Sequence, residues 1–232
     1  MGVPALSAPK VLLFDVNETL LNLAALEESV DSILLQNEGA KLWFSNLLHY
    51  SLVLTVSGQY RPFPEIGAAV LQMLARNRDV ILSEEDAMKA LEPMKSAPAH
   101  ADVHDALAAL REAGFRMATL TNSTSEGSKT QLGNAGIAQF FEQQLSVQTI
   151  GKYKPHRDVY LWAAEQMQVE PGDCMLVAAH PWDVAGAALA GMRSAFLTRV
   201  GVAVLPLAPV PEVEAADLGA LAKRLVALPK PV

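Results

Sequence analysis

Cysteine is almost absent from this chain, and its single cysteine, Cys174, excludes an internal disulfide bond. Low cysteine usage is typical of proteins in a reducing compartment. Cys174 lies in an apolar run without a neighbour that would activate a thiol, so we expect a buried core residue there. No apolar run approaches the roughly 18 residues of a membrane-spanning helix, and no basic segment followed by an apolar one opens the sequence. These absences predict a soluble, cytoplasmic protein.

Positive charge is also scarce: the chain has 18 Lys and Arg residues against 25 Asp and Glu residues, a formal net charge of -7. This balance argues against nucleic acid and anionic membrane surfaces as partners. It does not exclude a small-molecule anionic substrate, because a local positive site can bind an anion inside an acidic protein. The 232 residues, 51% of them hydrophobic, suffice for one large domain or a domain with an inserted subdomain.

Strand and helix signals alternate clearly after residue 100. Short apolar runs predict strands, and amphipathic stretches bounded by turn residues predict helices. This alternation is typical of a doubly wound, Rossmann-like parallel sheet. The predicted strands are 11–14, 115–120, 174–178 and 194–198, and the predicted helices are 103–113, capped by Asp102, 124–134, 155–167, beginning at Pro155, and 182–190.

Residues 21–97 show helical periodicity without a clear buried strand. Ser83, followed by three acidic residues, marks the start of one helix in this stretch. Because the stretch falls between the first strand and the rest of the sheet, we predict a helical cap lying over the carboxyl edge of the sheet. The predicted organisation is an α/β core of residues 1–20 and 98–232 with an inserted cap of residues 21–97.

The most informative segment is the apolar run Val11–Phe14, which ends abruptly in Asp15 and is followed four residues later by Thr19. Such a run is typical of a buried strand in a parallel sheet. In open α/β sheets, ligands bind just beyond the carboxyl ends of the strands. Asp15 therefore occupies the position of a catalytic carboxylate, although a strand followed by an ordinary Asx turn explains the same residues.

Three further segments place polar residues after predicted strands or before predicted helices. Each has an ordinary explanation alone: a turn of Thr, Asn and Ser, a solvated lysine, or an acidic residue at a helix N-terminus. Because the carboxyl ends of parallel strands share one edge, the segments together predict a single site. They are Thr119–Ser123, Tyr153–Tyr160 and Ala178–Asp183.

The four motifs, in this order along nearly the whole chain, resemble those of the haloacid dehalogenase superfamily, and most closely its L-2-haloacid dehalogenase branch with a small helical cap. The resemblance implies that Asp15 is a nucleophile that forms a covalent ester, and that Thr19 supports its loop. Lys154 would neutralise the anionic centre and lower the pKa of Asp15. Tyr160 would hydrogen-bond into the same site, and Asp183 would orient Lys154 and help to activate water.

The resemblance also assigns the substrate's anionic end to Thr121 and Asn122, whose hydroxyl and amide would hold a carboxylate or phosphate. An apolar pocket wall would be formed by Leu48, Phe63 and Trp182. A homodimer is what the resemblance suggests for the assembly.

Two departures argue against a phosphatase. Phosphatases of this superfamily carry a second aspartate two residues after the nucleophile, where this chain has Asn17. They also hold magnesium with an acidic pair in the last motif, and here Ala179 replaces the partner of Asp183. Both replacements agree with a metal-independent dehalogenase without cofactors, and magnesium would be needed only under the phosphatase alternative.

The dehalogenase match has departures of its own. An arginine in the cap receives the halide in that branch, and the matching position here is Phe44. The branch's serine and asparagine in the last motif appear as Ala178 and His180, and Asn17 replaces a tyrosine. His180 can substitute as a leaving-group partner or serve as a structural or capping histidine. Arg61 in the cap is a second candidate.

The predicted function is hydrolytic displacement of halide from short 2-haloalkanoic acids, through an aspartyl ester that water cleaves with help from Asp183 and Lys154. One alternative is a magnesium-dependent hydrolase of another small substrate, such as a phosphate ester. A second is a protein that keeps the fold but has weak or lost catalysis, because a fold alone does not fix a function.

Overall fold

The computed structural model describes residues 7–200 and 203–229. Its centre is a six-stranded sheet in the order β3-β2-β1-β4-β5-β6, and every neighbouring pair is parallel. The chain winds outward from β1 in both directions, so the predicted doubly wound, Rossmann-like α/β fold is confirmed. The strands are β1 (Val11–Phe14), β2 (Arg116–Thr121), β3 (Gln143–Ser146), β4 (Cys174–Ala178), β5 (Arg193–Leu197) and β6 (Val213–Ala215).

The two central strands, β1 and β4, are buried along their whole length. Helices cover both faces of the sheet, which is why these strands are continuous apolar runs. Phe14 pairs with Thr119 of β2 and with Val177 of β4. This register aligns the carboxyl ends of three strands, so the residues that follow them meet at one edge.

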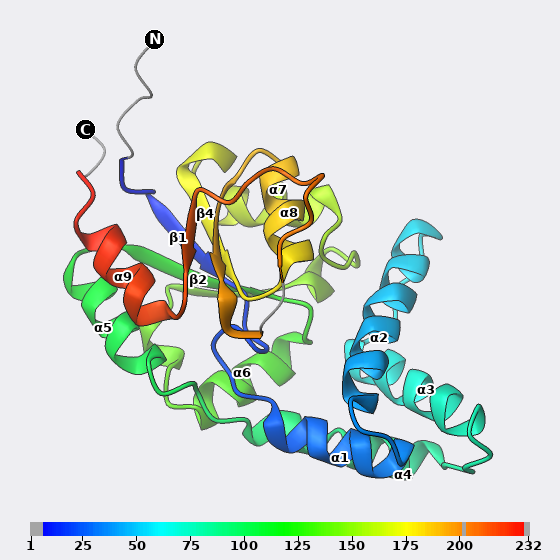
Figure 1. Cartoon of the computed structure of the whole chain (residues 1–232). Helices are drawn as coiled ribbons and strands as arrows, with labels where there is room; N and C mark the ends of the chain where they lie inside the picture. The colour runs from blue at the N-terminus through cyan, green and yellow to red at the C-terminus, as the bar shows by residue number, and fades with distance from the viewer. Residues whose placement is uncertain (1–6, 201–202, 230–232) are drawn as a thin grey trace.

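The helices around the sheet fall into two groups. In Figure 1, α5 and α9 lie together on one side of the sheet, and α7 and α8 lie on the other. Buried apolar side chains of each helix face the sheet and complete the core. Their bounds are α5 (Val103–Glu112), α6 (Ser125–Asn134), α7 (Arg157–Gln166), α8 (Pro181–Leu189) and α9 (Leu218–Val226), with short 3-10 turns η2 (Ala138–Phe140), η3 (Val147–Thr149), η4 (Pro171–Asp173) and η5 (Thr198–Val200).

The first four helices after β1, α1 to α4, form a separate group that extends away from the sheet (Figure 1). The Trp43 indole nitrogen donates to the Gly67 carbonyl at 2.9 Å and ties two of these helices together. The chain leaves and returns side by side, because Leu21 forms an isolated antiparallel bridge with Ala99. We propose residues 21–97 as the cap on this basis. Its elements are α1 (Ala24–Leu34), α2 (Gly39–Val56), α3 (Phe63–Arg76), α4 (Glu84–Ala90) and η1 (Glu92–Ser96).

Two local predictions were wrong in detail. Helix α7 begins at Arg157, not at Pro155, because His156 is its N-cap and accepts the amide of Asp158 through Nδ1. Asp102 precedes α5 but does not cap it, since its carboxylate binds the guanidinium of Arg199 instead. In the described part of the chain, no helix is long and apolar enough to cross a membrane.

Candidate active site

Asp15 is fixed at the end of β1 by the loop that follows it. Its amide donates to the Val177 carbonyl at 3.0 Å, which continues the sheet pairing by one residue. The Thr19 hydroxyl donates to Asp15 Oδ2 at 2.7 Å and accepts the Ala179 amide at 2.9 Å. The hydroxyl hydrogen is therefore aimed at the carboxylate, and the loops after β1 and β4 are joined at this point.

Lys154 is the second element of the site. Its ammonium donates to Asp15 Oδ1 at 2.9 Å, to Asp183 Oδ2 at 2.5 Å and to the Leu120 carbonyl at 2.9 Å. The Lys154 side chain is only 1% exposed, and the three acceptors use all three hydrogens of its ammonium group. The buried ammonium is therefore fully hydrogen-bonded, and its direction is fixed. Lys152 instead pairs with the exposed carboxylate of Asp158.

The ion pair between Asp15 and Lys154 determines the charge state of both side chains. Burial raises the pKa of Asp15, but the Lys154 ammonium and His180 outweigh it and hold that pKa well below its usual range. Burial lowers the pKa of Lys154, while Asp15 and Asp183 raise it to a net value above the usual range. Asp15 is therefore an anion at neutral pH, which is the state that a nucleophilic carboxylate needs.

Asp183 lies in the first turn of α8 and is fully buried. Its Oδ1 accepts the Tyr160 hydroxyl at 2.7 Å, while its Oδ2 accepts Lys154. Burial raises the pKa of Tyr160, and the neighbouring Asp183 raises it further, so the hydroxyl remains a donor. Asp183 and Tyr160 thus form a rigid support behind the ammonium.

A side chain of the loop after β2 accepts a hydrogen bond from the backbone of Lys154. Asn122 Oδ1 accepts the Lys154 amide at 3.0 Å, and Thr121 Oγ1 accepts the Ser123 amide at 3.1 Å. Asn17 turns toward this loop, because its Nδ2 donates to Ser123 Oγ at 3.3 Å.

His180 lies between two carboxylates and two aromatic rings. Its Nδ1 is 3.0 Å from Asp15 Oδ2, and its Nε2 is 2.5 Å from Glu18 Oε2. The imidazole stacks on Phe44 of α2, with ring centroids 5.4 Å apart, and is 5.2 Å from the Trp182 ring. Burial lowers the pKa of His180, but its bonds to the two carboxylates raise it to about 9. His180 is thus an imidazolium at neutral pH, and Phe44 covers it.

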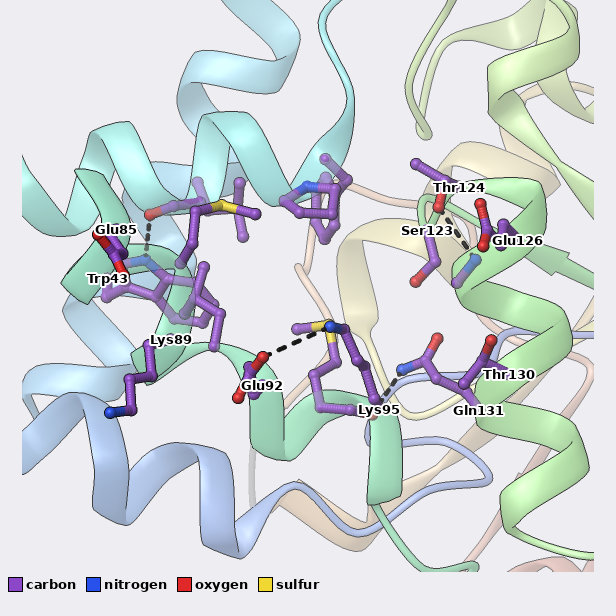
Figure 2. A pocket seen from close by; sticks show the side chains of 18 residues that line it. Trp43, Glu85, Lys89, Glu92, Lys95, Ser123, Thr124, Glu126, Thr130 and Gln131 are labelled. Carbon is purple, nitrogen blue, oxygen red and sulfur yellow. Dashed lines mark hydrogen bonds and ion pairs between the residues drawn. The ribbon is translucent and has the colours of Figure 1, made fainter.

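A cavity of about 720 Å³ lies between the cap helices and α6 (Figure 2), and Asp15, Lys154 and His180 are not among the residues that line it. Phe63 lines its apolar side and packs against the Tyr153 ring, with centroids 5.6 Å apart. Ser123 lines its opposite side and connects it to Asn17. Leu48 packs on the core as a partly buried residue, whereas Arg61 lines a separate hollow on the cap.

Three residues near the site were given no role of their own from the sequence. Glu18 binds His180, Ser123 binds Asn17, and the Gln131 amide donates to Asn17 Oδ1 at 3.0 Å. Glu18 follows Asp15 closely in sequence, so its proximity could have been inferred, but its partner comes from a loop that is distant in the chain. Among the described residues, no group of three or more His, Cys, Asp or Glu side chains is arranged to hold a metal ion.

Comparison with known proteins places this geometry in a family. The model of haloacid dehalogenase-like hydrolases matches residues 9–191. Haloacetate dehalogenase H-2 of Moraxella sp. (strain B) is 30% identical over 171 residues, which cover 74% of this chain and 76% of that protein. (S)-2-haloacid dehalogenase 1 of Pseudomonas sp. (strain CBS-3) is 27% identical, over 82% of this chain and 85% of the relative.

A solved structure gives the same result for the fold. L-2-haloacid dehalogenase from Xanthobacter autotrophicus superposes with a TM-score of 0.82 at 22% identity, covering 94% of this chain and 99% of that one. The family model spans most of the chain, and the motifs around Asp15, Lys154 and Asp183 fall inside the matched range. The chain belongs to the haloacid dehalogenase-like hydrolases.

Proposed function

We propose that this chain removes halide hydrolytically from short 2-haloalkanoic acids and yields 2-hydroxy acids. The observation that carries the proposal is the buried carboxylate of Asp15, ionised and held by Lys154 and Thr19 at the carboxyl end of β1. The relatives named as haloacetate and 2-haloacid dehalogenases support this choice of substrate.

The first step is a displacement at carbon. Asp15 Oδ1 has one side-chain donor, Lys154, whereas Oδ2 has both Thr19 and His180. A carboxylate oxygen with fewer donors keeps more of its nucleophilicity, so Oδ1 attacks the carbon that bears the halogen. The halide leaves with its bonding electrons, and an ester links Asp15 to the substrate.

Substrate binding falls to the groups that surround this carboxylate. The Asn122 Nδ2 group and the loop amides after Asp15 are donors for the substrate carboxylate. Phe44 and Trp182 supply apolar surface near the reacting carbon. The arginine expected at position 44 for the halide is absent, because the chain has Phe44 there.

The donor set does not suit magnesium. Mg²⁺ prefers carboxylate oxygens in octahedral geometry, and Asn17 and Ala179 stand where magnesium-dependent relatives of this superfamily carry carboxylates. The Lys154 ammonium already bridges Asp15 and Asp183. We therefore propose a reaction without a metal or cofactor.

The test is halide release from L- and D-2-chloropropionate, chloroacetate and fluoroacetate in the presence of a chelator. We expect release by the natural protein and none by the Asp15→Asn variant, which keeps the shape but loses the nucleophile. Full release by the variant would refute the role of Asp15. No release by the natural protein, together with magnesium-dependent cleavage of phosphate esters, would replace this proposal with the phosphatase alternative.

A further inference from the structure

The unusual feature of the site is the pair of contacts that His180 makes on opposite sides of its ring. Nδ1 faces Asp15 Oδ2 at 3.0 Å, and Nε2 faces Glu18 Oε2 at 2.5 Å. Phe44 and Trp182 pack near the ring and limit its movement. A histidine held by a carboxylate on one nitrogen and directed at a reacting group with the other has the geometry of an oriented general base.

The backbone conformation of Glu18 and a hydrogen bond to its carbonyl group fix the position of this residue. Its φ is 57°, in the left-handed region that costs free energy for a residue other than glycine. The His100 ring donates to the Glu18 carbonyl at 3.1 Å. The side chain is 18% exposed and is directed back toward His180.

Asp183, the base expected from the family resemblance, is less well placed. Each of its oxygens accepts a hydrogen bond, from Lys154 and from Tyr160, and the side chain is fully buried. It reaches Asp15 only through the Lys154 ammonium. His180 contacts the reacting carboxyl group directly.

We propose that His180, oriented by Glu18, activates the water that hydrolyses the Asp15 ester; this inference rests on the proposed function. Neutral His180 takes one water proton at Nδ1 while the water oxygen bonds to Asp15 Cγ. The tetrahedral intermediate then breaks its bond to the ester oxygen, and the second water proton passes to the departing alkoxide. Asp15 returns as a carboxylate beside protonated His180.

Over one catalytic cycle the enzyme loses one proton and regains one. The free enzyme holds His180 as an imidazolium between two anions, and esterification removes the charge of Asp15. The imidazolium then gives up its Nδ1 proton, which leaves as the acid that accompanies the released halide. The water proton taken in the next step restores the starting state.

The surroundings of His180 favour the loss and return of its Nδ1 proton. Burial lowers its pKa, and Asp15 and Glu18 together raise that pKa to about 9 in the free enzyme. Phe44 of α2 and Trp182 of α8 carry no charge. Once Asp15 is an ester, burial and Glu18 alone remain, so the pKa of His180 falls below about 9 and its neutral form, which is the form that acts as a general base, becomes more populated.

The experiment follows the ester directly with L-2-chloropropionate. Halide release and the mass of the protein are measured together in single-turnover mixing, with circular dichroism to check folding. We expect His180→Gln to release one halide for each protein, retain the propionate group on Asp15 and slow its hydrolysis by about 100-fold or more. Glu18→Gln should slow hydrolysis less and lower the pH at which the rate reaches half its maximum. Glu28→Gln, an exposed glutamate of α1, is the matched control and should behave as the natural protein.

Four results would overturn the proposal. The first is ester hydrolysis at the natural rate in His180→Gln, or in Glu18→Gln if His180→Gln does not fold. The second is ester accumulation in Asp183→Asn but not in His180→Gln, which would make Asp183 the base. The third is loss of halide release with no ester in His180→Gln, which would move His180 to the first step. The fourth is no halide release by the natural protein from any haloacid, which would also refute the proposed function.

Discussion

Lys154 Nζ lies 2.5 Å from Asp183 Oδ2, and neither side chain has more than 1% of its surface exposed. The same ammonium binds Asp15, so two buried carboxylates share one positive charge. Removal of a buried partner leaves uncompensated charge in a medium that solvates it poorly. The arrangement therefore couples the stability of the core to the chemistry of the site.

The first prediction concerns this shared charge. Lys154→Met keeps the approximate length of the side chain but leaves Asp15 and Asp183 without their ammonium. We expect the free energy of unfolding to fall by about 3 to 5 kcal/mol, and turnover to fall by about 100-fold or more. Urea unfolding and halide release measure the two effects.

Lys152→Met is the matched control for that variant. Lys152 pairs with Asp158, but the two side chains are 39% and 49% exposed, so water screens their charges. We expect no measurable change in unfolding or turnover. Equal losses of stability in the two variants would contradict the special position of Lys154.

The second prediction concerns the hydroxyl of Thr19. Thr19→Val removes a donor to Asp15 Oδ2 and leaves the buried Ala179 amide without its acceptor. We expect a loss of about 1 to 3 kcal/mol in unfolding free energy and slower ester formation, because the loop no longer fixes the nucleophile. Thr19→Ser keeps the hydroxyl and should retain most of the turnover; equal turnover in the two variants would rule out a role for the hydroxyl.

The third prediction is a pH dependence of stability. Folding raises the pKa of His180 from 6.5 to about 9, because Asp15 and Glu18 overcome the effect of burial. The stabilisation is therefore complete below the unfolded value and is lost as the pH rises through about 9. Compared with His180→Gln, the natural protein should lose on the order of 2 to 3 kcal/mol of unfolding free energy between about pH 6 and about pH 10. A constant difference between the two proteins across that range would exclude the charged His180.

The central strands were predictable because their sequences are unambiguous. Val11–Phe14 and Cys174–Ala178 are apolar throughout, and the structure assigns both strands the predicted bounds. Strands β3 and β6 were missed. Their sequences, Gln-Gln-Leu-Ser and Val-Glu-Ala, are short and partly polar because both strands lie at the edges of the sheet.

The position of a candidate site residue was predictable where a strand end fixes it. Asp15, for example, directly follows the apolar run of β1, a local pattern that can be identified without knowledge of the fold. The contacts of His180 were not predictable, because they depend on the left-handed backbone of Glu18 and on Phe44 from the cap. Asp102 shows the same limit, since its salt bridge with Arg199 replaces the expected cap.

The last prediction concerns the packing beneath the site. A Cβ added to Gly186 of α8 would clash with Pro155 Cβ and would lie 2.6 Å from the Tyr160 hydroxyl oxygen. Gly186→Ala must therefore displace the residues that hold Asp183 and Lys154, and we expect it to cost about 1 to 3 kcal/mol of stability and to lower turnover. Gly133 of α6 has no atom within 4 Å of its added Cβ.

Gly133→Ala should consequently stabilise the protein slightly, since alanine favours a helix by up to about 1 kcal/mol. Thermal unfolding should shift in opposite directions in the two variants, and only Gly186→Ala should lower halide release, if α8 packs on Tyr160 as closely as Gly186 indicates. A stable, fully active Gly186→Ala protein would mean that the Tyr160–Asp183 support tolerates displacement. The rigidity of the ammonium would then have to come from Asn122 and Leu120 instead.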